Sequence, residues 1–293
     1  MGNNEDIKPD YGMNAREQLK FLGNPNELHG QNQAAILDWL YRWGFSTADI
    51  LSDLLGRKNR SHAKKLADRG WIRQVSIKGY PVYYTLTERG LAEAVKHHET
   101  LLEYKEIDPY RVHLPTLHHN LVAQKETMMA LRRGWIFDYR TERMPAADND
   151  KFTKVYDVIW TRERDTRGDW YPESIIWTSF NSNEYPHVFC GYPEVQVGLE
   201  IELTPKWNHH LDDFVTKILQ DVQGSHLQWI IIVSDSPAIL KRYSEAFSPG
   251  RKVPFWNKGP GGKLVRSERS LTVPEGIYET VLFRTTNWQD RND

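Results

Sequence analysis

The fold of this chain is decided by the stretch VQVGLEIEL at residues 195–203, in which apolar side chains alternate with others. Successive side chains of a β-strand point to opposite faces of the sheet, so the pattern predicts a strand with one apolar face. Glu200 and Glu202 then stand side by side on the other face. We therefore expect a strand that holds two carboxylates together.

A third carboxylate, Asp157, interrupts the apolar and aromatic stretch KVYDVIW at residues 154–160, a second predicted strand. A buried carboxylate without a partner is costly, so we expect Asp157 to have one. If the two strands are neighbours, Asp157, Glu200 and Glu202 converge as oxygen donors of the kind that hard divalent cations prefer. The three form a candidate metal site for Mg²⁺ or Mn²⁺. The alternative is a solvated sheet face that carries ordinary acids.

Length and composition favour two domains, because 293 residues with 39% hydrophobic content can build more than one core. The net charge of -1 gives no global argument for a nucleic-acid partner, so any such argument depends on how charge is distributed. The single cysteine, Cys190, excludes an intramolecular disulfide and fits a cytoplasmic location. No uncharged apolar run is long enough to predict a membrane segment. Residues 1–28 are predicted to be a flexible lead-in.

The first predicted domain covers residues 29–105. Helical spacing of apolar residues, a Ser-Thr cap before an acid and a turn between two β-rich runs indicate three helices and a hairpin. The predicted elements are helix 31–45, helix 46–56, helix 59–69, strand 71–77 and strand 82–86. This order predicts a winged helix-turn-helix.

Charge is concentrated in this domain, since residues 57–78 carry a net +7. Such a basic stretch at a recognition-helix position is typical of phosphate binding, whereas the alternative is a solvated helix face. Arg60, His62 and Lys64 are predicted to contact a groove or phosphates, and Lys78 to lie at the wing tip. The full predicted DNA-binding set is Arg57, Lys58, Arg60, His62, Lys64, Lys65, Arg73 and Lys78.

The second predicted domain covers residues 106–293 and has a mixed α/β core. Its predicted elements are helix 117–133, strands 135–141, 155–160 and 195–203, helix 209–223 and the buried strand 228–234. The insertion 161–193 mixes arginines with aromatic residues, which predicts either packing or contact with single-stranded DNA. The basic, glycine-rich tail 251–269 is predicted to be a flexible loop, which lies either beside nucleic acid or simply in solvent.

The order of acidic residues and elements resembles the PD-(D/E)xK fold of restriction enzymes. Asp157 lies on one predicted strand and Glu-x-Glu on the next, followed by a helix and an apolar strand. Tyr156 replaces the usual proline, and Glu202 stands where lysine is usual, as in a minority of these enzymes. With the winged helix and the runs at 113–120 and 200–206, residues 30–235 resemble the replication-relaxation group and MobC-type plasmid relaxases.

The resemblance implies metal-dependent nicking of one strand of double-stranded DNA at a plasmid transfer origin, together with relaxosome accessory and coupling proteins. Asp157 and Glu200 would bind Mg²⁺ or Mn²⁺, while Glu202 would bind the metal as well and orient or deprotonate a water. Lys206 is the candidate for stabilising transition-state charge, and Lys217 is the alternative.

Two other functions remain open from sequence. One is a non-catalytic winged-helix DNA-binding regulator, or a relaxosome accessory protein with a degenerate nuclease domain. The other is a dimeric restriction enzyme that cuts both strands of a symmetric site.

Overall fold

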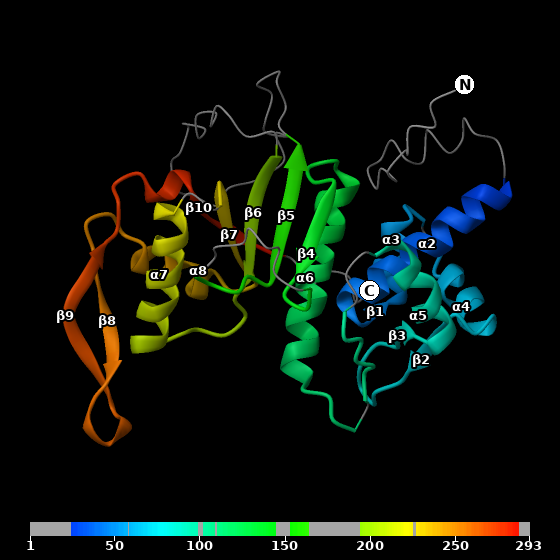
Figure 1. The fold of residues 1–293 in the computed structure, drawn as a ribbon, viewed down its shortest axis with the longest axis horizontal. Coiled ribbons are helices and arrows are strands. Elements are labelled where there is room, and N and C mark those ends of the chain that lie inside the picture. The colour runs from blue at the N-terminus through cyan, green and yellow to red at the C-terminus, as the bar shows by residue number, and fades with distance from the viewer. Residues whose placement is uncertain are drawn as a thin grey trace. The chain divides into compact units, whose positions relative to one another are not determined.

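The computed structural model describes seven stretches of the chain, residues 25–57, 59–98, 102–108, 110–144, 153–163, 194–224 and 227–286. Internal contacts divide the chain into two compact units, residues 1–145 and 146–293 (Figure 1). This division falls later than residue 106, where the second domain is predicted to start. In the described stretches, no helix is both long enough and apolar enough to cross a membrane.

The first unit consists of helices around a small antiparallel sheet with the strand order β1-β3-β2. Its core is lined by side chains of α2, among them Trp39 and Leu40, which are at most 1% exposed. The elements follow the predicted order of helices and hairpin. They are α2 (Pro25–Trp43), β1 (Ser46–Thr47), α3 (Ala48–Leu54), α4 (Ser61–Asp68), β2 (Ile72–Val75), β3 (Tyr83–Leu86), α5 (Glu88–Ala94), η1 (Val95–His97), α6 (Leu114–Arg132) and β4 (Asp138–Thr141).

Two threonines start helices of this unit, because each hydroxyl accepts a backbone N–H that the first turn leaves unpaired. Thr47 accepts from Ile50 at the start of α3, and Thr87 accepts from Gly90 at the start of α5. Gly90 is required by its surroundings, since a Cβ there would lie 2.0 Å from the carbonyl oxygen of Trp71. The residue that precedes β2, the first strand of the hairpin, therefore lies directly against α5.

The buried side-chain amide of Gln124 links helix α6 to the rest of the first unit. The Gln124 side chain is 0% exposed; its Nε2 donates to the Phe45 carbonyl at 2.9 Å and its Oε1 accepts from the Trp39 indole at 3.2 Å. A buried amide with both ends satisfied specifies one packing arrangement. These contacts explain why the compact division comes after α6 and not before it.

The strands of the second unit lie in a mixed sheet in the order β10-β7-β6-β5. Strand β5 runs antiparallel to β6, whereas β6 and β7 are parallel, as are β7 and β10. The mixed α+β prediction is confirmed at this level. The remaining elements are β5 (Val158–Glu163), β6 (Glu194–Ile201), α7 (Asn208–Gln223), β7 (Trp229–Ser234), α8 (Pro237–Ala246), β8 (Lys252–Lys258), η2 (Pro260–Gly262), β9 (Leu264–Thr272), η3 (Ile277–Glu279) and β10 (Val281–Thr285).

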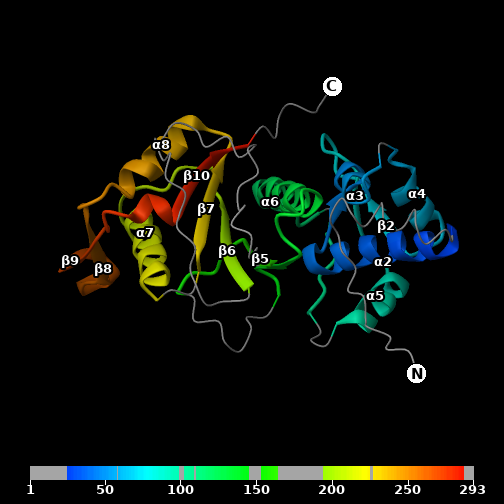
Figure 2. The same cartoon turned by 90° about the horizontal axis from the view of Figure 1, so that it is seen from above.

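Helices α7 and α8 cover one face of this sheet (Figure 2). Their apolar side chains, such as Phe214 and Tyr243, form one buried cluster with Ile230 and Ile232 of β7. Gly198, in the middle of β6, leaves room for the ring of Tyr156, because a Cβ there would lie 2.8 Å from Cδ1 of that ring. The glycine thus brings the segment before β5 close to β6, where the acidic residues lie.

One prediction about this unit is wrong, and another concerns residues that are mostly outside the described stretches. The tail 251–269 is not a flexible loop, because β8 and β9 pair as an antiparallel hairpin. Most of the insertion 161–193 lies outside the described residues, and so does Cys190.

Candidate functional site

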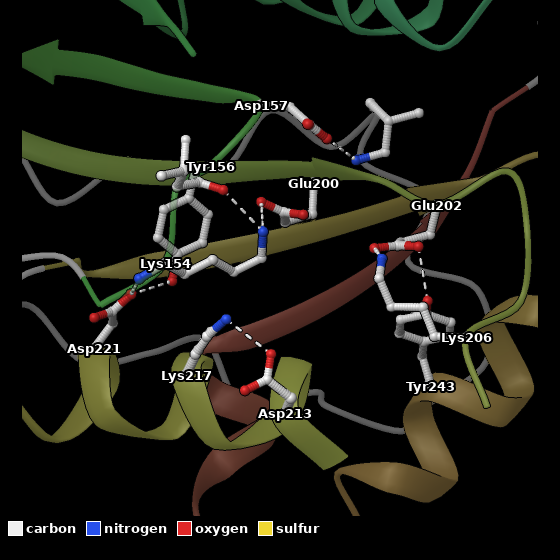
Figure 3. Close-up of polar contacts among 12 residues, drawn as sticks. Lys154, Tyr156, Asp157, Glu200, Glu202, Lys206, Asp213, Lys217, Asp221 and Tyr243 are labelled. Carbon is white, nitrogen blue, oxygen red and sulfur yellow. Dashed lines mark hydrogen bonds and ion pairs between the residues drawn. The ribbon is translucent and has the colours of Figure 1, made fainter. Parts of the chain in front are cut away.

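The two glutamates of the predicted motif lie at the end of β6 and are both buried. Glu200 is 3% exposed and Glu202 is 4% exposed. Glu202 follows the last residue of the strand, yet its N–H still donates to the Val233 carbonyl of β7 at 2.8 Å. The backbone therefore holds both carboxylates in fixed positions on the sheet (Figure 3).

Each glutamate has its own lysine. The ammonium of Lys154 lies 2.7 Å from Glu200 Oε1, and that of Lys206 pairs with Glu202 Oε1. Both ammonium groups also lie near the ring of Phe214 on α7, at 5.3 and 4.7 Å from its centroid. The site therefore consists of two buried carboxylates, each paired with a partly exposed lysine, beside one aromatic ring.

Burial changes the acidity of Glu200. Removal from water, and after it the neighbouring Asp157 carboxylate, raises the pKa of Glu200 to about 8, although Lys154 acts in the opposite direction. Glu200 therefore takes up a proton at a higher pH than an exposed glutamate does. A pKa displaced this far at a cluster of charged groups marks a candidate functional site.

Glu202 has a second partner in Tyr243 of α8, whose hydroxyl donates to Oε2 at 2.7 Å. Burial, followed by the negative charge of Glu202, raises the pKa of Tyr243 well above its ordinary value, so the tyrosine remains a donor. With Lys206 on one oxygen and Tyr243 on the other, Glu202 is held in one orientation.

Asp157 lies just before β5, where its Oδ2 accepts the N–H of Ile201 at 2.7 Å. Its segment is fixed by Asp221 of α7, which is 0% exposed. Asp221 accepts the Tyr156 hydroxyl at 3.0 Å and the Lys154 N–H at 3.2 Å. This network sets the position of Lys154 relative to Glu200.

The predicted metal triad is not assembled as a three-ligand group. Among the described residues, no group of three or more His, Cys, Asp or Glu side chains is arranged to hold a metal ion. Asp157 contacts a backbone N–H, and the glutamates contact lysines and Tyr243. The carboxylate oxygens suit Mg²⁺ or Mn²⁺ chemically, but binding requires the lysines to be displaced from them.

Of the two lysines weighed from sequence, the structure brings Lys206 to the site. Lys217 instead pairs with Asp213 on α7 at 2.8 Å. Sequence reasoning missed Lys154, Tyr243 and Asp221. The only local signal was the position of Lys154 three residues before Asp157, since Tyr243 and Asp221 reach the site through tertiary packing.

The predicted DNA-binding residues of the first unit differ in exposure. Lys64 and Lys65 on α4, and Lys78 in the turn between β2 and β3, are exposed. Arg60 is exposed and pairs with Asp49, whereas Arg73 is exposed and pairs with Glu106 at 2.7 Å.

His62 and Arg57 of that set lie close to each other and are at most partly exposed. His62 is only 9% exposed, and its Nδ1 lies 3.4 Å from Arg57 Nη1. Because little of the imidazole is exposed, the structure gives no support to a groove or phosphate contact by His62, which stays a prediction. Lys58 lies outside the described residues.

Comparisons with known proteins add no support to the resemblance found in the sequence. No family model matches the chain, and neither a curated protein nor a solved structure gives a significant match. The likeness to PD-(D/E)xK enzymes and MobC-type relaxases therefore depends on the residues quoted above and on nothing else.

Proposed function

We propose that the protein is a DNA nickase in which a winged helix-turn-helix binds duplex DNA and a restriction-endonuclease-like unit cleaves one strand with Mg²⁺ or Mn²⁺. The observation that carries the proposal is the pair of buried glutamates at the end of β6, each held by a lysine, with Asp157 at the start of the neighbouring strand. Burying charged side chains here costs more free energy than burying apolar side chains of similar volume would. Such a cost is typical of a site kept for chemistry.

The strand pattern supports the same proposal. An antiparallel pair, β5 and β6, is followed by α7 and by the parallel strand β7. This is the order expected from the resemblance, with Asp157 and the Glu-x-Glu residues at adjacent strand ends.

The residues have distinct roles in the proposed reaction. Asp157, Glu200 and Glu202 would hold the metal ion, which when bound polarises the scissile phosphate and lowers the pKa of a water. Glu202, oriented by Tyr243, would accept the proton of the attacking water. Lys154 and Lys206, once they leave the carboxylates, would place their ammonium groups beside the phosphate, where negative charge develops.

The first unit supplies the proposed DNA contacts. Helices α3 and α4 precede the β2–β3 hairpin, and Lys64, Lys65 and Lys78 present exposed charge on the helix and the hairpin turn. Exposed cations of this kind bind phosphates without sequence preference. In the cytoplasm, the proposed substrate is double-stranded DNA at a plasmid transfer origin, with single-stranded DNA and relaxosome accessory and coupling proteins as further partners.

The proposal is tested by incubating the full chain with a supercoiled plasmid that bears its own transfer region. We expect conversion to the open-circular form with manganese, none with a chelator, and none for Glu200→Gln under either condition. Linear product would indicate a double-strand cutter instead. A plasmid that stays supercoiled with every divalent ion, although the protein binds the duplex, would overturn the nickase.

The second candidate function is the non-catalytic DNA-binding regulator or accessory protein. It is favoured by the lysine partner that each buried glutamate already has, because ion pairs that satisfy both charges need no metal. Under this alternative the protein binds duplex equally well with manganese and with a chelator, and Glu200→Gln changes neither binding nor the plasmid.

A further inference from the structure

The β8–β9 hairpin is a long two-stranded ribbon of the second unit that is fixed only at its base. There Val253 and Val273 are at most 1% exposed, and Asp212 of α7 accepts from Arg251 at 2.7 Å and from Trp256 at 3.0 Å. Beyond this base the turn of the ribbon extends past the end of α7 (Figure 1), and the ribbon lies on the outer side of that helix (Figure 2).

The outer half of the ribbon, residues 257–270, packs on no core. Along β9 the side chains of Leu264, Val265 and Arg266 are all exposed, so both faces of the strand meet solvent. Leu264 is 41% exposed and Val265 is 52% exposed. An isolated two-stranded hairpin is at best marginally stable, so packing within this unit does not account for the length of the ribbon.

Charge on the ribbon has one predominant sign. Residues 252–269 carry a net +4 in a chain whose net charge is -1, and Glu268 is their only acid. The exposed cations of the outer half are Lys258, Lys263, Arg266 and Arg269. Glycines with positive φ at 261 and 262 form the turn between the strands without bulky side chains. The ribbon is thus narrow, cationic and unhindered at its tip.

These properties fit one partner. The major groove of B-DNA, about 12 Å wide, admits a two-stranded β-ribbon, and cations along such a ribbon neutralise the phosphates that border the groove. We propose that the outer half of the β8–β9 ribbon is a second contact to duplex DNA, made by the unit that carries the carboxylate site. The inference rests on the proposed function, because it assigns the ribbon to the same DNA.

The experiment measures fluorescence anisotropy of a labelled random-sequence duplex with the full chain over a range of potassium chloride concentrations. The ribbon variant is Lys263→Gln with Arg266→Gln. The control is Lys217→Gln with Lys241→Gln, which removes two cations from helices of the same unit. Because each phosphate contact contributes about 0.9 to the slope of log affinity against log salt, we expect the ribbon variant to lower that slope by about 1.8. The control is expected to leave it unchanged.

The outcomes separate this inference from the proposed function. If Lys64→Ala with Lys65→Ala weakens binding whereas the ribbon variant, with an unchanged circular-dichroism spectrum, binds as the wild type does, the ribbon contact is overturned and the winged helix stands. If the wild type binds no duplex, both fall. If Leu264→Ser abolishes a dimer seen by light scattering and the ribbon variant leaves the salt slope unchanged, the ribbon joins two copies of the chain and the DNA contact is refuted.

Discussion

The two units use charge in opposite ways. On α4 of the first unit, Lys64 and Lys65 are exposed, whereas at the end of β6 in the second unit Glu200 and Glu202 are buried and each pairs with a partly exposed lysine. Exposed cations add little to the stability of a fold and are available to a ligand. Buried pairs must offset the loss of water, so removal of one partner is expensive.

The contrast between the two units indicates which amino-acid substitutions should leave the fold intact. Substitutions on α4 should alter DNA affinity and its salt dependence but leave folding unchanged. Substitutions around β6 should alter folding and chemistry together.

Asp221→Ala should be the most damaging single substitution. Asp221 is 0% exposed and accepts hydrogen bonds from Tyr156 and Lys154, and each such bond to a charged group is worth about 1.5–3 kcal/mol. We expect the free energy of unfolding in urea to fall by about 3 kcal/mol or more. Lys64→Ala on α4 should change it by less than about 0.5 kcal/mol. Equal losses for the two variants would remove the contrast between the units.

Stability should fall with rising pH because of Glu200. The raised pKa means that the folded state keeps a proton on Glu200 that the unfolded chain loses above its ordinary value of 4.5. This contribution is complete below pH 4.5 and is lost as the pH rises through about 8, by at most about 1.4 kcal/mol per pH unit. Urea unfolding at several pH values should show a flatter profile for Glu200→Gln. The exposed Glu106→Gln serves as the control, and a flattening of the same size there would contradict the assignment.

Lys64→Ala with Lys65→Ala should weaken duplex binding and reduce the salt dependence. Two lost phosphate contacts lower the slope of log affinity against log salt by about 1.8. His62→Gln should leave the slope unchanged, because the imidazole is buried. Anisotropy titrations measure both, and a lower slope for His62→Gln would show that this histidine reaches DNA after all.

Lys217→Ala should have the smallest effect. Lys217 pairs with Asp213 on the surface of α7, and exposed pairs of this kind are worth at most about 1 kcal/mol. Nicking should be unaffected, whereas Lys206→Ala should slow it at least tenfold, because the ammonium group proposed to stabilise negative charge on the phosphate is lost. If Lys217→Ala were the slower enzyme, the roles of the two lysines would be reversed.

Much of the fold follows from the pattern of apolar residues. The period of two in 195–203 predicted β6, and helical spacing predicted α6 and α7 within a few residues of their observed ends. Glycines and basic residues in 251–269 predicted a loop, because the pattern alone does not show that Val253 and Trp256 anchor a hairpin on α7.

The candidate site was predictable only in part. The alternation around Glu200 and Glu202 correctly placed two carboxylates together at one strand end. Their partners Lys154 and Tyr243 come from other segments, so their contacts depend on tertiary packing. The burial of His62 was not predictable from its neighbours, since a polar residue on a basic helix can still face the core.

The most direct test of the proposed site is calorimetric titration of the full chain with manganese chloride, free of DNA. We predict a binding heat for the wild type that is lost in Glu200→Gln, whose side chain keeps the shape of glutamate but lacks its charge. An absence of heat at millimolar manganese, or the same heat in both proteins, would contradict the central claim that the carboxylates at the end of β6 hold the metal for strand cleavage.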